Sequence, residues 1–225
     1  MSIRKLAAAW IFMLLLMTSG CSGVPFRETP LVPVVGADPA AAVKRFDADS
    51  PVEFQLLNTI VFEYGWKKFG GLGLVAVNTK DRTFNIACIN QLGVKLFELT
   101  GNKDQVVANF VMPEFAKQGD FAKTVGEDIK RIYFDLVPSP DAKIEIEKYR
   151  IVFRQSFGPG VIEYVFAGPG LDLVEKNYSE DGSSVWRISY YEYTRDKGKL
   201  YPAGTVLSND KHGYRFIVRL KEIQE

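Results

Sequence analysis

The stretch SVWRISYYEYTRDKGKLYPAGTVLSNDKHGYRFIVRLKEI, from Ser184 to Ile223, decides the fold class. It contains three runs rich in aromatic and β-branched residues, which the polar breaks RDKGK and NDKHG separate. Such runs favour strands, and short breaks with Gly, Asn and Asp are typical of turns between antiparallel strands. The stretch therefore predicts the last part of an antiparallel meander.

The same pattern extends back through most of the chain. After residue 140, KIEIEKYRIVFRQ, VIEYVFA and LDLVEKNYS are strand-like, with FGPG and GPG between them. Further upstream, a run in which Phe54, Leu56, Ile60 and Phe62 alternate is followed by GLGLVAVNT, RTFNIACIN, VKLFELT and QVVANFV. Many short strands with regular turns predict a mainly β protein, with about ten to eleven antiparallel strands in one curved sheet.

Helical patterns interrupt the strands at a few places. Asp38 and Pro39 before AAAVKRF predict a short capped helix, and MPEFAKQG predicts another. Asp120 is expected to cap a longer helix, FAKTVGEDIKRIYFDL, which Pro138 ends. Its apolar residues recur at helical spacing: Phe121, Val125, Ile129, Ile132 and Leu136. We expect this amphipathic helix to cover the mouth of a cavity inside the curved sheet.

The N-terminus has the three-part layout of a secretory signal peptide. Arg4 and Lys5 precede an apolar run, and small residues then lead to Cys21. A transmembrane helix is the alternative, but the apolar run is shorter than the ~20 residues that a bilayer requires. We therefore predict a signal peptide over residues 1–20, a lipidated, proline-containing tether over 21–37, and one folded domain over 38–225. The alternative for the tether is an edge strand, which its prolines disfavour.

The composition excludes some classes of protein. The 225 residues include 28 Lys+Arg and 27 Asp+Glu, which gives a formal net charge of +1 and no electrostatic case for nucleic-acid binding. The two cysteines are Cys21 and Cys88, so lipidation of the first would leave the second without a partner. Cys88 shares the alternation of Phe84 and Ile86, and we expect it to be a small buried hydrophobic residue.

Residue patterns for catalysis are missing from the sequence. His212 is the single histidine and falls in the turn NDKHGY, with no second histidine or reactive cysteine to share a site. Glu145 and Glu147 alternate with isoleucines, as on the solvated face of a strand. We therefore predict no catalytic residue, no metal site, no cofactor and no enzymatic activity.

The small residues that end at Cys21 resemble a bacterial lipobox, although Thr18 replaces the usual leucine. The resemblance implies that Cys21 becomes the N-terminus and carries diacylglycerol and an amide-linked acyl chain such as palmitate, an anchor of two or more chains. Ser22 lacks the aspartate that retains lipoproteins at the inner membrane, which implies the outer membrane, with the domain facing the periplasm.

Three segments resemble the LolA/LolB-like fold, and LolB outer-membrane lipoprotein receptors and related lipoproteins in particular. They are IACINQLGVKLFELT, MPEFAKQGDFAKTVGEDIKRIYFDLVP, and the closing strands from LVEKNYSEDG onward. The resemblance implies a strongly curved antiparallel half-barrel, closed by helices over a hydrophobic cavity that binds acyl chains. It also places Leu92 at an exposed leucine that enters the membrane, whereas the alternative is that Leu92 folds back onto the core.

Together these patterns predict an outer-membrane lipoprotein that binds acyl chains of lipids or lipoproteins and hands them to the outer membrane. We expect a monomer that receives its cargo from a periplasmic carrier protein. The alternatives are an envelope scaffold with a filled core, and an enzyme acting on envelope lipid or glycan. The predicted ligand-binding residues, chosen by alternation, are Phe54, Leu56, Phe62, Leu74, Phe84, Ile86, Phe97, Ile129, Ile132, Trp186 and Phe216.

Overall fold

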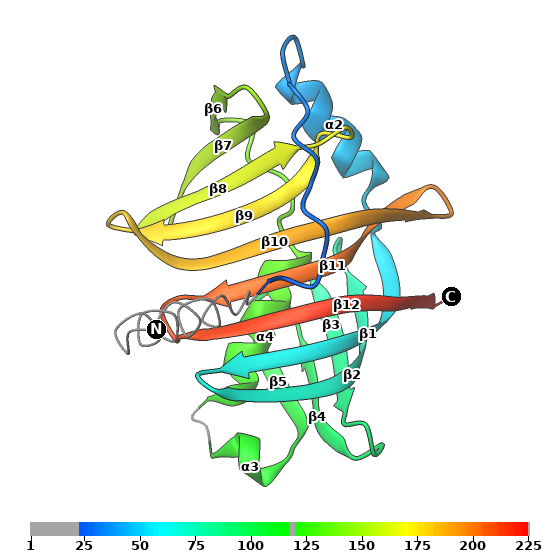
Figure 1. The fold of residues 1–225 in the computed structure, drawn as a ribbon. Coiled ribbons are helices and arrows are strands. Elements are labelled where there is room, and N and C mark those ends of the chain that lie inside the picture. Colours follow the sequence, from blue (N-terminus) through cyan, green and yellow to red (C-terminus); the bar gives the residue numbers. More distant parts are fainter. Residues whose placement is uncertain (1–22, 118–119, 225) are drawn as a thin grey trace, which may run out of the picture.

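The structure, a computed structural model, describes residues 23–117 and 120–224. In this part of the chain, twelve antiparallel strands form one curved sheet with helices packed against it (Figure 1). The elements are α2 (Pro39–Asp49), β1 (Glu53–Tyr64), β2 (Lys67–Asn78), β3 (Thr83–Ile89), β4 (Lys95–Gly101), β5 (Val106–Val111), α3 (Pro113–Ala116), α4 (Phe121–Tyr133), β6 (Lys143–Ile146), β7 (Arg150–Phe157), β8 (Gly160–Ala167), β9 (Asp172–Glu180), β10 (Ser183–Asp196), β11 (Lys199–Asn209) and β12 (Tyr214–Gln224). The predicted mainly β class and curved half-barrel are confirmed.

The sheet order is β5-β4-β3-β2-β1-β12-β11-β10-β9-β8-β7-β6, so the sheet stays open between the edge strands β5 and β6. The last strand, β12, pairs with β1 on one side and β11 on the other. In this register Phe62 lies opposite Phe216, and Ile60 lies opposite Val218. The concave face therefore collects the alternating apolar residues of both halves of the chain.

The number of strands is one or two higher than predicted because KIEIEKYRIVFRQ is two strands rather than one. The chain turns between Ile146 at the end of β6 and Arg150 at the start of β7, and the Glu147 backbone N–H donates to the Arg150 carbonyl over 2.9 Å. The apolar residues change from even positions, Ile144 and Ile146, to odd positions, Tyr149 and Ile151, across this turn. This shift in alternation marks the break, and the prediction of a single strand overlooked it.

Helix α4 packs against the concave face and ends earlier than predicted. It stops at Tyr133, because the next residue, Phe134, is extended with a ψ of 159°, and Leu136 lies beyond this point. The buried side chain of Lys176 on β9 donates from Nζ to the carbonyls of Arg131 and Phe134, over 2.8 and 2.9 Å. These bonds satisfy carbonyls that the end of a helix leaves without partners.

Gly126 allows α4 to approach the edge strand β5 closely. A Cβ atom at this position would lie 2.4 Å from Cγ2 of Val106, closer than two carbon atoms can approach without displacement. The glycine has a cost in a helix, about 1 kcal/mol relative to alanine. The close packing of α4 onto the sheet therefore depends on the absence of a side chain here.

The predicted capped helix over AAAVKRF is confirmed as α2, with Asp38 Oδ1 accepting from the Ala40 backbone N–H over 2.9 Å. Residues 23–37 form neither helix nor strand, and they run over the convex side of the sheet (Figure 1). Phe26 and Val34 in this segment are buried. The part of the predicted tether that the structure describes is therefore attached to the domain, while the predicted signal peptide and Cys21 lie outside the described residues.

Candidate functional site

An apolar cavity of about 520 Å³ lies between helices α3 and α4 and the adjoining parts of β1, β2 and β12. Its volume is within the range of ligand pockets, about 300–1,000 Å³. Most of its walls are aromatic and aliphatic, with a few polar groups among them. The lining residues are Phe62, Tyr64, Lys67, Phe69, Glu114, Phe115, Phe121, Thr124, Val125, Asp128, Ile129, His212, Tyr214 and Phe216.

A chain of aromatic contacts joins α3 and the start of α4 to the sheet. The ring centroid of Phe121 lies 5.3 Å from that of Phe97 on β4 and 5.1 Å from that of Phe115 on α3. Phe115 in turn lies 6.0 Å from Phe69 on β2. Aromatic pairs at these distances contribute about 0.5–1.5 kcal/mol beyond the burial of their area. Aromatic side chains thus hold α3 and the start of α4 beside the cavity.

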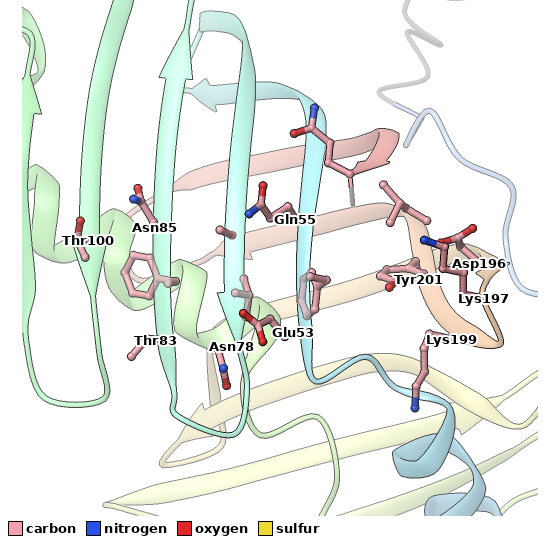
Figure 2. A pocket seen from close by; sticks show the side chains of 16 residues that line it. Glu53, Gln55, Asn78, Thr83, Asn85, Thr100, Asp196, Lys197, Lys199 and Tyr201 are labelled. Carbon is pink, nitrogen blue, oxygen red and sulfur yellow. The ribbon is translucent and has the colours of Figure 1, made fainter.

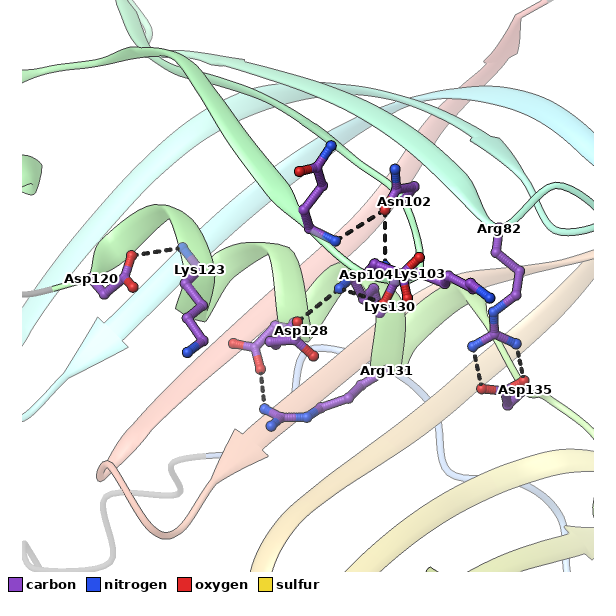
Figure 3. Close-up of polar contacts among 12 residues, drawn as sticks. Arg82, Asn102, Lys103, Asp104, Asp120, Lys123, Asp128, Lys130, Arg131 and Asp135 are labelled. Atoms are coloured by element: carbon purple, nitrogen blue, oxygen red, sulfur yellow. Dashed lines mark hydrogen bonds and ion pairs between the residues drawn. The ribbon is translucent and has the colours of Figure 1, made fainter. Parts of the chain in front are cut away.

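A polar group interrupts the apolar wall where α4 meets β12. Asp128 accepts a hydrogen bond from Arg131 Nη1 over 2.7 Å and another from the Tyr214 hydroxyl, which itself accepts from Asn209 Nδ2 over 3.0 Å. Figure 3 shows the Asp128–Arg131 contact on the same helix. Burial raises the pKa of Asp128, and the Tyr214 hydroxyl and Arg131 act in the opposite direction. Burial and the neighbouring carboxylate raise the pKa of Tyr214.

The predicted ligand-binding residues do not all lie in this cavity. Phe62, Ile129 and Phe216 line it. Five others are buried in the same core away from it: Leu56, Ile86, Phe97, Ile132 and Trp186. Their role in binding stays a prediction.

Leu74 lies on the wrong face for the predicted role. Its side chain is 40% exposed, whereas Val75 and Val77, on the opposite face of β2, are buried. The run GGLGLVAV is apolar on both faces, and the concave positions at its start are Gly71 and Gly73. Alternation alone therefore could not identify the buried face of this strand.

The middle of the concave face is filled by side chains. Between the sheet and α4, the space lined by Ile60, Ile86, Ile129 and Ile132, among others, is only about 10 Å³. This is about the space that one water molecule requires. A long ligand therefore has room at the end of the half-barrel beside α3, but no room in its centre in this structure.

A second cavity, of about 720 Å³, lies at the opposite end of the strands (Figure 2). Phe54 and Phe84, two of the predicted ligand-binding residues, line it together with Tyr201. Polar side chains surround them, and the labelled ones in Figure 2 include Glu53, Asn85 and Lys199. Because more polar and charged side chains line this second cavity, it suits an apolar ligand less well than the first cavity does.

Cys88 and the two glutamates considered for catalysis are either buried in the core or paired with arginines. Cys88 is buried, and burial raises the pKa of its thiol to about 11. Glu145 pairs with Arg154, and Glu147 accepts from Arg150 Nε over 2.9 Å.

Within residues 23–117 and 120–224, no group of three His, Cys, Asp or Glu side chains is placed to hold a metal ion. No helix in the same ranges is long and apolar enough to cross a membrane.

Two hairpin tips at the cavity end of the sheet carry exposed apolar side chains. Trp66, in the tight turn between β1 and β2, is 89% exposed, and Leu92, in the turn between β3 and β4, is 87% exposed. The Asn90 side chain accepts from the Leu92 backbone N–H over 2.9 Å and holds the turn. Leu92 therefore does not fold back onto the core. We call these two residues the apolar tips.

Sequence reasoning missed several residues of the cavity. Phe69, Phe115, Asp128 and Tyr214 were not among the predicted site residues, yet all four line it. The aromatic character of Phe69, Phe115 and Tyr214 was visible in the sequence, but Asp128 and Tyr214 are 86 positions apart. Only the packing of α4 on β12 brings them together, and no spacing in the sequence indicates it.

Comparison with solved structures bears on the fold alone. No protein-family model matches the chain, and a search of curated proteins gives no match. Among solved structures, a domain from Vibrio parahaemolyticus described as an outer membrane lipoprotein-sorting protein is similar over 82% of this chain and 90% of its own, with 8% identity and a TM-score of 0.50. A LolA superfamily protein from Nitrosomonas europaea covers 82% of this chain and 92% of its own, with 7% identity and a TM-score of 0.47. A DUF1329 family protein from Desulfovibrio piger covers 82% of this chain and 90% of its own, with 9% identity and a TM-score of 0.47. The likeness to the domain from Vibrio parahaemolyticus supports the predicted fold.

Proposed function

We propose that this protein binds the acyl chain of a lipid or lipoprotein in the cavity beside α3 and passes it to the outer membrane. The observation that carries the proposal is the aromatic cavity of about 520 Å³, which lies at the same end of the sheet as the apolar tips. Each buried methylene contributes about 0.8 kcal/mol, so several methylenes supply useful affinity without covalent chemistry. The fold of the lipoprotein-sorting domain from Vibrio parahaemolyticus is consistent with this role.

The proposed anchor is a lipid on Cys21. Phe26 is buried on the convex face, where the Arg219 guanidinium lies 4.5 Å from its ring centroid. The chain advances five residues from Cys21 to Phe26, and it could span at most about 17 Å if fully extended. Five residues along β12, from Arg219 to Tyr214 at the cavity end, span about the same distance. The anchor and the apolar tips can therefore reach one bilayer together.

The apolar tips are the proposed contact with the membrane. Gly65, with a φ of 57°, occupies the first position of the two-residue turn and directs Trp66 away from the core. Tryptophan is favoured at membrane–water interfaces, where the ring is half in an apolar environment. Lys67 Nζ lies 5.8 Å from the Trp66 ring centroid, and its charge suits a lipid head-group region. Cargo released at this end would meet the bilayer directly.

A scaffold with a filled core is the competing function, and the filled centre of the concave face is the observation that favours it. The two proposals differ in whether the cavity beside α3 accepts an acyl chain. Catalysis on lipid or glycan has less support, because burial raises the pKa of Tyr214, whose hydroxyl donates to Asp128 in this cavity, and so keeps that hydroxyl a weak nucleophile.

Titration of the purified protein with a fluorescent acyl amide tests the proposal. We expect saturable binding that long acyl chains displace. Thr124→Trp should fill the cavity and weaken binding at least tenfold, because Thr124 lines it. Lys123→Trp is the matched control, since Lys123 is exposed on the same helix, and it should bind like the original protein. Absence of binding by the folded protein would favour the scaffold.

A further inference from the structure

The carboxylate of Asp128 is placed at the wall of a cavity that is otherwise mainly apolar. The residue is only 5% exposed, and it lines the cavity together with Thr124, one helical turn earlier on the same face. A buried carboxylate has a cost in free energy unless donors surround it. Its presence in an apolar wall therefore requires either a structural or a binding role.

The structural partners of Asp128 leave part of its capacity unused. Oδ1 accepts from Arg131 Nη1, and Oδ2 accepts from the Tyr214 hydroxyl. An ionised carboxylate has about four lone-pair sites, so each oxygen can accept one more donor. A ligand in the cavity is in a position to supply it, because Asp128 forms part of the wall.

The charges around Asp128 do not favour an anionic head group. Arg131 already donates to Asp128, and its guanidinium lies 5.6 Å from the Trp186 ring centroid. The other charged or titratable groups that line the cavity are Lys67, Glu114, His212, Tyr64 and Tyr214, and the ring of His212 stacks on that of Tyr214. The carboxylate of a fatty acid beside Asp128 would be repelled by its negative charge, and Arg131, the cation next to Asp128, is already paired with it.

We infer that Asp128 makes the cavity selective for acyl chains whose head group carries an N–H or O–H donor, and against free fatty acids. This inference rests on the proposed function and names the ligand class for the same cavity. The ligand N–H or O–H donates to Asp128, and the Thr124 hydroxyl is available as a donor to a carbonyl next to it. An acyl amide has both groups in adjacent positions. Amide-linked acyl chains occur in lipids and at acylated peptide N-termini alike.

The test measures displacement of the neutral fluorescent hydrocarbon diphenylhexatriene from the purified protein by three ligands of equal chain length. These are dodecanamide, methyl dodecanoate and dodecanoate, which provide a donor, no donor and a negative charge. We expect dodecanamide to bind about tenfold more tightly than either of the others, the effect of one hydrogen bond to a charged group. In Asp128→Asn, the preference for dodecanamide over dodecanoate should fall to about threefold or less.

Glu127→Gln is the matched control, because it neutralises a carboxylate next to Asp128 on the same helix that pairs with Lys130 and does not line the cavity. The preference for dodecanamide should survive in this variant, and circular dichroism should show that both variants are folded. An unchanged preference in folded Asp128→Asn would overturn the inference and leave Asp128 as a link between α4 and β12. Failure of every ligand to displace the probe would instead overturn the proposed function.

Two further ligands identify the source of the amide. N-dodecanoyl-diserine amide represents an acylated peptide N-terminus, and dodecanoyl ethanolamide represents a lipid amide. Tighter binding of either one than of dodecanoate supports the inference, and the tighter of the two gives the source. Binding of both that is weaker than that of dodecanoate would contradict it.

Discussion

The Nζ atom of Lys176 lies 2.9 Å from the carbonyl oxygen of Phe134, so a strand residue caps a helix. Lys176 also donates to the carbonyls of Arg131 and Asp135, and the Tyr190 hydroxyl on β10 donates to the Ile132 carbonyl over 2.9 Å. The C-terminal end of α4 is therefore fixed to β9 and β10. The aromatic contacts hold its other end, beside the cavity.

Lys176 should make stability depend on pH in a definite direction. Burial lowers its pKa from 10.5 to about 7. Between these values the unfolded chain binds more protons than the folded one, so the free energy of unfolding rises with pH, by up to about 1.4 kcal/mol per unit. Denaturant unfolding from pH 7 to 9 should show this slope, and Lys176→Met should lose it. The exposed Lys211→Met should keep it. Equal slopes in all three proteins would mean that the three carbonyls hold Lys176 protonated.

Gly126→Ala should destabilise the protein although alanine favours helices. The added Cβ would lie 2.4 Å from Val106 Cγ2, and such overpacking typically costs about 1–3 kcal/mol. In a Val106→Ala background the space exists, and the same change should be neutral or stabilising. Denaturant unfolding of the four proteins measures the coupling. A stabilising Gly126→Ala in both backgrounds would show that α4 does not pack closely on β5.

Trp66→Glu and Leu92→Glu should each impair contact with membranes and leave the fold intact. Both side chains are almost fully exposed, so neither contributes to the core. Burial of such a side chain in a bilayer contributes about 1.5–3 kcal/mol, and its loss should slow transfer of an acyl probe to liposomes about tenfold or more. Leu31→Glu, also at an exposed residue but on the N-terminal segment, is the control. A sharp fall in melting temperature would reassign either tip to the core.

Cys21→Ala should release the protein from the membrane fraction. The change removes the proposed site of lipidation, and a signal peptide alone is too short to span a bilayer. Fractionation combined with mass spectrometry of the N-terminus checks the result. An uncleaved variant that stays with the membrane is consistent with the proposal. A variant of mature length that remains bound to the membrane contradicts it.

The strand pattern was predictable from the sequence because each strand carries its own alternation. Phe84, Ile86 and Cys88 share the buried face of β3, as their parity predicted. Alternation failed for Leu74, where both faces of the strand are apolar, and helical periodicity failed at Leu136. There the carbonyls at the end of the helix accept from Lys176, which is 40 positions further along the chain, so the local pattern did not indicate these bonds.

The candidate site was less predictable than the fold. The cavity results from how α3 and α4 lie against β1, β2 and β12, and this depends on contacts such as Phe69–Phe115 and Asp128–Tyr214. Alternation identifies which residues are buried, but not where packing leaves a space. Alternation therefore did not separate Phe62, Ile129 and Phe216, which line the cavity, from Leu56 and Ile132, which fill the core.

The position of β12 between β1 and β11 determines the order in which the chain can fold. Tyr64 pairs with Tyr214, so the contact that joins the two halves of the sheet closes a very long loop. Non-local pairings of this kind make folding slow, because loop-closure entropy is lost before the contacts form. During synthesis, one edge of β1 has no partner strand until β12 has been made. The sheet can therefore be completed only after the residues of β12 have been made.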